Sequence, residues 1–429
     1  MGEGRGAAGL SSEATVSLFR PARNTILVFL FFATGAAIWF GVTARPPLWM
    51  ESVLKLAAML VTATLLALSQ YRAPLFALGL VLGALPGAAF AFAAAALATT
   101  LLPSGLLIAL AAGLGFAVAL SSAERFALRV IDSEEPEREA VALLLEERLF
   151  VVSILIVATA APAIVAIAGS RISLFDALLF AGSNAAAVLC AWVAVPLLCS
   201  FTRVGEEFIA STNRIRESWT RRLDGVAATA RSPWAWSAAG ILLVLLALAF
   251  FGSTNMPISE DVRGRLDIVA GVTVAVVLAG ALIAARDLRR ALATCLTTLS
   301  ILVFADWGLA RLGAPLYEAT LHLEAALLAI GFVAVAATAA AAARSARAEA
   351  AGASEAGVFA AGPSAAIGML SALVFVALWY PEGGSTWLGA LLALAFAGTG
   401  ALVFQPALAC VLETLLPRRK TIAERYRVK

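Results

Sequence analysis

The sequence predicts an all-α, polytopic membrane protein of about twelve transmembrane helices, built as two six-helix repeats with both termini in the cytoplasm. Three observations predict this fold: the composition, a series of long apolar windows, and the placement of positive charge. Of the 429 residues, 62% are hydrophobic and 14% are charged, whereas soluble domains are about half apolar and about a quarter charged. A chain of this composition is expected to fold in lipid.

Twelve windows of the chain are apolar enough to cross a bilayer, which takes roughly 20 residues in a helix. The windows are continuously apolar, so they lack the alternating pattern of a barrel strand, and in lipid a helix satisfies every backbone group within its own segment. We therefore predict helices at 25–42, 50–69, 74–101, 104–120, 149–169, 175–200, 234–252, 266–285, 289–309, 317–341, 363–380 and 386–411.

Positive charge falls mainly on one side of this layout. With both termini in the cytoplasm, 25 of the 31 Lys and Arg residues lie in inside segments and 6 lie in outside segments. Because cytoplasmic loops of membrane proteins carry an excess of Lys and Arg, this asymmetry supports both the number of spans and the orientation.

The windows divide the chain into five predicted parts. These are a cytoplasmic N-terminal segment (1–24), a first six-helix repeat (25–202), a cytoplasmic linker (203–232), a second six-helix repeat (233–411) and a basic cytoplasmic tail (412–429). In the linker, Arg residues are mixed with Ile209, Ile215 and Trp219, a pattern that suits an amphipathic helix at the lipid headgroups. A solvated connector is the alternative for this segment.

The two halves match in their loop lengths and in their last spans. An Arg-bearing turn precedes the third span of each half, with Arg72 in the first and Arg289 in the second. Each half also ends in a proline-containing apolar run, around Pro196 and Pro406. Parallel six-span repeats are a known transporter plan, so we predict a duplication. The alternative is that any two Ala- and Leu-rich spans look alike.

Short motifs stand at corresponding places in the two halves. They are Gly113-Leu114-Gly115-Phe116-Ala117 in the first, and Leu312-Gly313-Ala314-Pro315-Leu316-Tyr317 and Ala329-Ile330-Gly331-Phe332-Val333 in the second. With this layout and these motifs, the sequence resembles the membrane core of the resistance-nodulation-division (RND) superfamily, especially its MmpL-like and hopanoid-exporter branch. The resemblance implies a role in the transport of a lipid or another hydrophobic molecule.

Two features depart from that family. Its members carry large extracytoplasmic porter domains after the first and seventh spans, whereas the corresponding loops here are 43–49 and 253–265. Its pumps also carry a proton-binding acid in the fourth or tenth span, where this sequence has Ala117 and Val333. We therefore expect transport without the usual proton antiport. The alternative is a degenerate, non-transporting RND-like subunit that scaffolds or regulates a larger membrane complex.

Ionisable side chains are rare in the predicted spans, and those that occur are candidate functional residues because charge is costly to bury in lipid. The main group is Glu318, His322 and Glu324, near the outer end of the tenth window. Glu318 and His322 are four residues apart and share a helix face, an arrangement that suits a proton or ligand site. An interfacial polar cap is the alternative.

Two further features lie deeper in the predicted membrane. Asn184 in the sixth window is a fourth candidate for ligand contact, with a hydrogen bond to a neighbouring helix as the alternative. Gly79, Gly83 and Gly87 repeat every four residues and therefore share one face of the third window. Such a face allows close helix packing.

The sequence also argues against several classes of function. It has no phosphate-binding G-x-x-x-x-G-K-[ST] motif and no H-E-x-x-H motif, and we predict no enzymatic activity, no cofactor and no metal site. No basic patch indicates nucleic-acid binding. The cysteines lack a C-x-x-C pair and are interpreted as packing residues; they are Cys190, Cys199, Cys295 and Cys410.

The expected partners are membrane lipids and the proteins of a membrane assembly, with homo-oligomerisation as a further alternative. The high usage of Ala and Arg is typical of a high-GC bacterium, which places the expected location in the bacterial inner (cytoplasmic) membrane.

Overall fold

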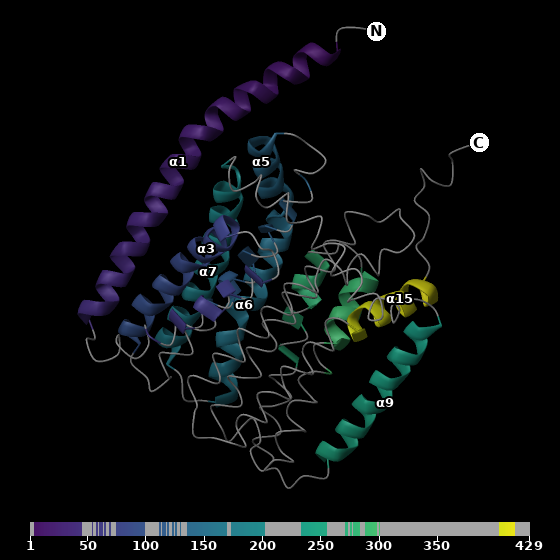
Figure 1. The fold of residues 1–429 in the computed structure, drawn as a ribbon. Coiled ribbons are helices and arrows are strands. Elements are labelled where there is room, and N and C mark those ends of the chain that lie inside the picture. The colour runs from purple at the N-terminus through teal and green to yellow at the C-terminus, as the bar shows by residue number, and fades with distance from the viewer. Residues whose placement is uncertain are drawn as a thin grey trace.

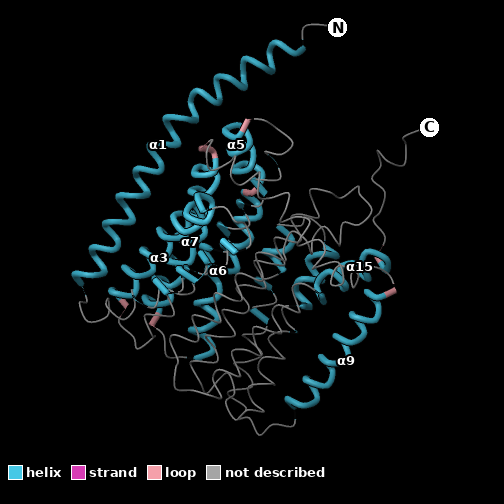
Figure 2. Tube along the Cα trace, viewed as in Figure 1, coloured by secondary structure: helices cyan, strands magenta, loops and turns pink. Residues whose placement is uncertain are grey.

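The structure is a computed structural model of the chain, and it describes most of its first half and parts of its second (Figure 1). The described residues are 4–44, 74–98, 135–169, 173–201, 233–254, 288–297 and 403–416, with single positions and short runs within 54–69, 111–129 and 271–283 and at 300. Within these ranges all regular structure is helical (Figure 2), which confirms the predicted all-α class there.

The labelled helices are α1 (Gly4–Ala44), α3 (Pro74–Leu97), α5 (Pro136–Glu146), α6 (Arg148–Gly169), α7 (Leu174–Cys199), α9 (Trp234–Thr254) and α15 (Gln405–Leu415). Helices α3, α6, α7 and α9 follow their predicted windows closely, whereas α5 lies in a segment predicted to be outside the membrane. Three helices in the described part are long and apolar enough to cross a membrane, over Phe19–Ala44, Ala77–Leu97 and Leu174–Cys199. The windows 317–341 and 363–380 lie outside the described residues, so the count of twelve spans, the repeat and the orientation of the termini stay predictions.

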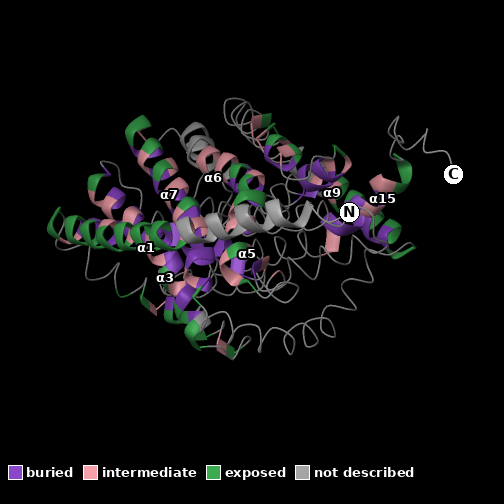
Figure 3. Cartoon of the chain, turned by 90° about the horizontal axis from the view of Figure 1, so that it is seen from above, coloured by how far each residue is buried: buried purple, intermediate pink, exposed green. Residues whose placement is uncertain are grey.

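Helix α1 is longer than the window predicted for the first span. It begins at Gly4, so most of the predicted N-terminal segment 1–24 is helical, and Pro21 lies inside the helix. Ala, Leu and Glu before Pro21 favour a helix. Hydropathy did not predict this part of the helix, because the polar residues among them lower the mean hydropathy of the segment. Much of α1 is exposed (Figure 3). Its exposed residues include large apolar side chains, among them Phe31 at 76% exposed and Trp39 at 69% exposed. A face of this kind suits contact with lipid.

The core of the first half is the contact between α3 and α7, against which α1 and α6 also pack. A Cβ atom built on Gly87 would lie 2.5 Å from the Cα atom of Ala187 in α7. One built on Gly83 would lie 2.6 Å from a methyl group of Val195 in α7, whereas one on Gly79 would meet open space. Because lipid gives helices little hydrophobic reason to associate, close van der Waals packing of small residues holds such pairs together.

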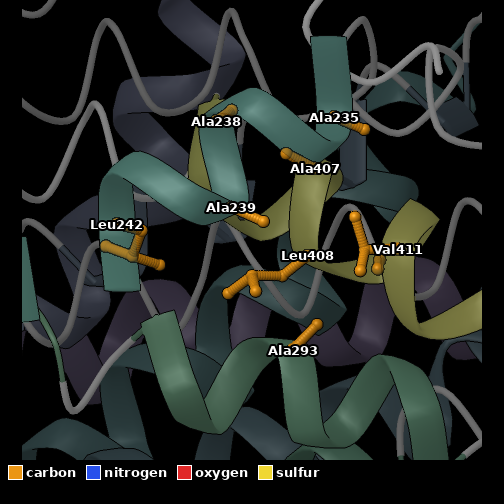
Figure 4. Close-up of a cluster of buried hydrophobic side chains, with 9 residues drawn as sticks. Ala235, Ala238, Ala239, Leu242, Ala293, Ala407, Leu408 and Val411 are labelled. Carbon is orange, nitrogen blue, oxygen red and sulfur yellow. The ribbon is translucent and has the colours of Figure 1, made fainter. Parts of the chain in front are cut away.

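A second core lies between α9, α15 and the helix at 288–297. Its buried cluster combines Ala238 and Leu242 of α9, Leu408 and Val411 of α15, and Ala293 of the third helix (Figure 4). Two residues in π-helical conformation, Val403 and Phe404, immediately precede α15. A single π-helical turn inside a helix is uncommon and frequently accompanies a functional site.

Gly87 contacts α7 closely and Gly79 does not, so the two positions provide a matched pair of variants. We expect Gly87→Ala to lower the free energy of unfolding by about 1–3 kcal/mol, because the new methyl group forces the two backbones apart. We expect Gly79→Ala to be neutral or to stabilise the protein by up to about 1 kcal/mol, because its methyl group meets open space and Ala is the better helix former. Unfolding of both variants in mixed detergent micelles measures the difference. Equal effects of the two substitutions would contradict the close α3–α7 contact.

Candidate functional site

The centre of the first half is a junction of three backbones. Gly115 lies beside the α3–α7 contact, where a Cβ atom on it would be 3.6 Å from the carbonyl oxygens of both Ala84 and Ala187. Gly115 belongs to the Gly-Leu-Gly-Phe-Ala run that resembles the family's fourth span. Ala117, the position of the family's proton-binding acid, lies outside the described residues. The described part of this junction is built from small, apolar residues.

Asn184 lies in α7 one turn from that junction. It is 1% exposed, and its neighbour Ser183 donates a hydrogen bond to the carbonyl oxygen of Phe180 at 2.9 Å. The structure therefore places Asn184 inside the helix bundle, away from lipid. Its contact with a ligand stays a prediction.

The acidic and histidine group is not among the residues that the structure describes. Glu318, His322 and Glu324, and also Val333, lie outside the described ranges. Among the residues that are described, no group of three or more His, Cys, Asp or Glu side chains could hold a metal ion. All four cysteines are present as free thiols.

A charged cluster that sequence reasoning missed joins α1, α5 and the end of α7. Arg23 is 8% exposed, and its guanidinium donates to the hydroxyl of Ser200 at 3.0 Å and pairs with the Glu137 carboxylate at 3.5 Å. The guanidinium carbon also lies 4.0 Å from the centre of the Phe201 ring, which is a cation–π distance. Arg20 pairs with the same carboxylate at 2.8 Å, but its side chain is 65% exposed.

The cluster continues along α5 towards α6. Glu147, between these helices, is 2% exposed; its carboxylate pairs with Arg125 at 3.1 Å and accepts a hydrogen bond from the Ser122 hydroxyl at 3.0 Å. Arg129 pairs with Glu139 at 3.3 Å and also with Glu146. Each of these carboxylates thus has an arginine partner, so the arrangement suits a clamp between helix ends better than a proton acceptor.

The described part of the second half contains a polar contact between helices. Arg290 and Glu413 pair at 3.1 Å between the helix at 288–297 and α15. Beyond Arg290, Thr294 and Thr297 are buried on the same helix, and Gln405 is buried at the start of α15. These residues lie among predicted spans but were not predicted as a site. The sequence signals were Thr294 and Thr297 in the window 289–309 and one uncharged polar residue, Gln405, in an otherwise apolar run.

The comparisons with known proteins identify the kind of membrane fold. No protein-family model matches the sequence, and no curated protein matches it. Among solved structures, the chain is similar to SecDF, a translocon-associated membrane protein from Thermus thermophilus, with a TM-score of 0.59 and 13% identity over 85% of this chain and 62% of that one. SecDF in its super-membrane-facing form gives a TM-score of 0.53 at 11% identity, over 87% of this chain and 63% of that one.

A second similar protein is Disp, the hedgehog release protein of the water bear Hypsibius dujardini. Its TM-score is 0.60 at 9% identity, over 85% of this chain and 71% of that one. SecDF and Disp are both RND-superfamily membrane proteins, so this chain is a membrane protein with an RND-like fold. It spans less than two thirds of the length of the SecDF chains.

The two arginines that share Glu137 should differ in their contributions to stability. We expect Arg23→Gln to lower the free energy of unfolding by about 1–3 kcal/mol, because it leaves a largely buried carboxylate without its inner partner. We expect Arg20→Gln to cost about 0–1 kcal/mol, because that pair is exposed to solvent.

Unfolding in mixed micelles at low and high salt separates the two pairs. Salt at about 1 M should screen the Arg20 contribution and leave most of the Arg23 contribution. A loss for Arg23→Gln no larger than that for Arg20→Gln would show that the cluster does not hold α1 against α5 and α7.

Proposed function

We propose that this chain is an RND-like transport protein of the bacterial inner membrane that moves a lipid or another hydrophobic molecule without the usual proton antiport. The RND-like fold carries the proposal, because it extends over 85% of the chain in the likeness to Disp, a release protein. The short predicted loops 43–49 and 253–265 support a cargo that reaches the protein from within the bilayer, since no large extracytoplasmic domain fits there. We also propose that the protein is not an enzyme.

The absence of proton coupling is supported by the residues around the first-half junction. Proton-driven transport needs a titratable group that changes its protonation during the cycle. The predicted acid positions are Ala117 and Val333, and the described neighbours at Gly87, Gly115 and Ala187 are apolar. In the described charged cluster, Glu137 and Glu147 pair with arginine.

A second candidate function is that of a non-transporting subunit in a membrane complex. One observation favours it specifically: SecDF, with which the chain shares its fold, is a translocon-associated protein. In this reading the charged cluster around Arg23 and Glu137 keeps the helix ends rigid for a partner.

Transport is tested with the purified protein in proteoliposomes that carry a fluorescent phospholipid in one leaflet. We expect redistribution between leaflets above that of protein-free vesicles, with the same rate with and without an imposed pH gradient. The double variant Glu318→Gln/His322→Ala should keep that rate. A rate that depends on the gradient and is lost in the double variant would overturn the proton-independent mechanism and restore a proton relay at these two residues.

The subunit function is tested by purification from native membranes in mild detergent, followed by mass spectrometry. If this second function holds, one protein partner should copurify at fixed stoichiometry and survive a salt wash, and Arg23→Gln should weaken its retention while Arg20→Gln should not. Purification of the chain alone, with one lipid class enriched over the bulk membrane, would favour transport and contradict the subunit reading.

A further inference from the structure

The side chain of Gln405 is the least satisfied polar group among the described residues. The residue is 0% exposed, and neither its amide oxygen Oε1 nor its amide nitrogen Nε2 has a hydrogen-bond partner. A buried amide without partners is destabilising in any protein interior, and more so in lipid, where no water replaces the missing bonds. Gln405 also directly follows the π-helical residues Val403 and Phe404.

The helix that faces Gln405 carries hydroxyl groups at the same depth. The Arg290–Glu413 pair and the contact of Ala293 with Leu408 (Figure 4) show that this helix and α15 run antiparallel. One further turn along both helices brings Thr297 level with Gln405. Thr297 is 0% exposed. It follows Ala293 by four residues and Gln405 precedes Leu408 by three, so each shares a helix face with the clustered residue, and we infer that the two polar residues lie between the same two helices.

The hydroxyl groups of this helix retain capacity to accept hydrogen bonds. Thr297 donates to the carbonyl oxygen of Ala293 at 2.8 Å, and Ser300 donates to that of Leu296 at 2.6 Å. Each hydroxyl oxygen therefore keeps lone pairs for another donor, while the Gln405 amide offers both a donor and an acceptor. The result is a cluster of hydrogen-bonding groups without formal charge.

The depth of this cluster restricts the kind of ligand. Eight residues separate Gln405 from Glu413, which at the helical rise is about 12 Å. The charges of Arg290 and Glu413 at the helix ends are paired with each other, so they do not offset a charge placed at Gln405. A charged group is costly at such a depth, whereas an uncharged hydroxyl group is both donor and acceptor and matches the amide.

The first half has no such group at the corresponding place. When the two proline-containing endings are aligned, Gln405 corresponds to Val195, which packs against Gly83. The first-half contact is thus closed by an apolar side chain, and the second-half contact contains an unpaired amide. A structural requirement common to both halves does not account for Gln405.

We propose that Gln405, Thr297 and Ser300 form an intramembrane binding site for the uncharged, hydroxyl-bearing headgroup of a lipid. The headgroup hydroxyl accepts from the Gln405 amide nitrogen and donates its one hydrogen to the hydroxyl oxygen of Thr297, and the Ser300 hydroxyl oxygen is a further acceptor one turn along the same helix. This site deepens the proposed function by naming the chemistry of the cargo, and it rests on that function only for the inference that the bound lipid is transported.

The test uses two photoreactive, clickable probes with the same acyl chains: diacylglycerol, whose headgroup is a hydroxyl, and phosphatidic acid, whose headgroup is charged. Full-length protein in nanodiscs is labelled at sub-saturating probe, and the modified peptides are identified by mass spectrometry. We expect saturable labelling by diacylglycerol in the segments around 288–300 and 403–416, which unlabelled diacylglycerol displaces. Gln405→Leu and Thr297→Val should each reduce it about three- to tenfold, the effect of losing one buried hydrogen bond.

Thr414→Val is the matched control, because the Thr414 hydroxyl bonds the carbonyl oxygen of Val411 on the same helix away from the proposed site. It should leave labelling unchanged. Phosphatidic acid should label the wild type and all variants equally and without saturation. The melting temperature of Gln405→Leu should rise, because an unpaired buried amide is replaced by an apolar group; Thr297→Val provides the same comparison if Gln405→Leu does not fold.

Undiminished diacylglycerol labelling in both Gln405→Leu and Thr297→Val would overturn the site. Saturable labelling by phosphatidic acid that is lost in the same variants would contradict the proposal that the headgroup is uncharged. The protein could also show labelling that depends on Gln405 and yet not redistribute lipid in proteoliposomes. That result would support the site and contradict the transport function, so the two proposals can be tested separately.

Discussion

The close approach of α3 and α7 at Gly87 and Ala187 is the contact on which the described first half depends. In lipid, apolar side chains gain little by facing one another, so helices associate where small residues let their backbones touch. With α7 fixed against α3, its end brings Ser200 and Phe201 to Arg23 of α1. The charged cluster is therefore a consequence of the apolar junction, because without it Ser200 and Glu137 would not meet one guanidinium.

The two described helix contacts differ in their chemistry. In the first half, Gly83 and Val195 leave no polar group between the helices. In the second, the residues of the helix at 288–297 and of α15 include the buried polar side chains of Arg290, Thr297 and Gln405. Tight apolar packing favours a rigid unit. An unpaired buried amide lowers the stability of the protein, and a ligand that forms hydrogen bonds with the amide can restore it. We infer from this difference that the described contact in the first half supports the structure and that the one in the second half binds the ligand.

The hydropathy pattern predicted the helices well but could not predict which groups meet. The bounds of α6 and α7 follow their windows because a continuous apolar run leaves the backbone no alternative to a helix in lipid. The four-residue spacing placed three glycines on one face, yet only neighbour positions show that Gly87 touches α7 and Gly79 does not. The partners of Arg23 lie 114 and 177 residues away along the chain, and no local pattern contains them.

Gln405 shows why the chemistry of a membrane site is harder to predict than its fold. In the sequence it is one uncharged residue before a proline, and in lipid such a residue ordinarily bonds a neighbouring helix. Only the structure shows an amide that is buried and unpaired. A protein without a titratable centre can still alternate between states if its ligand binds them unequally. An amide that is satisfied only when a hydroxyl-bearing lipid is present supplies such a difference, and it does so without any proton transfer.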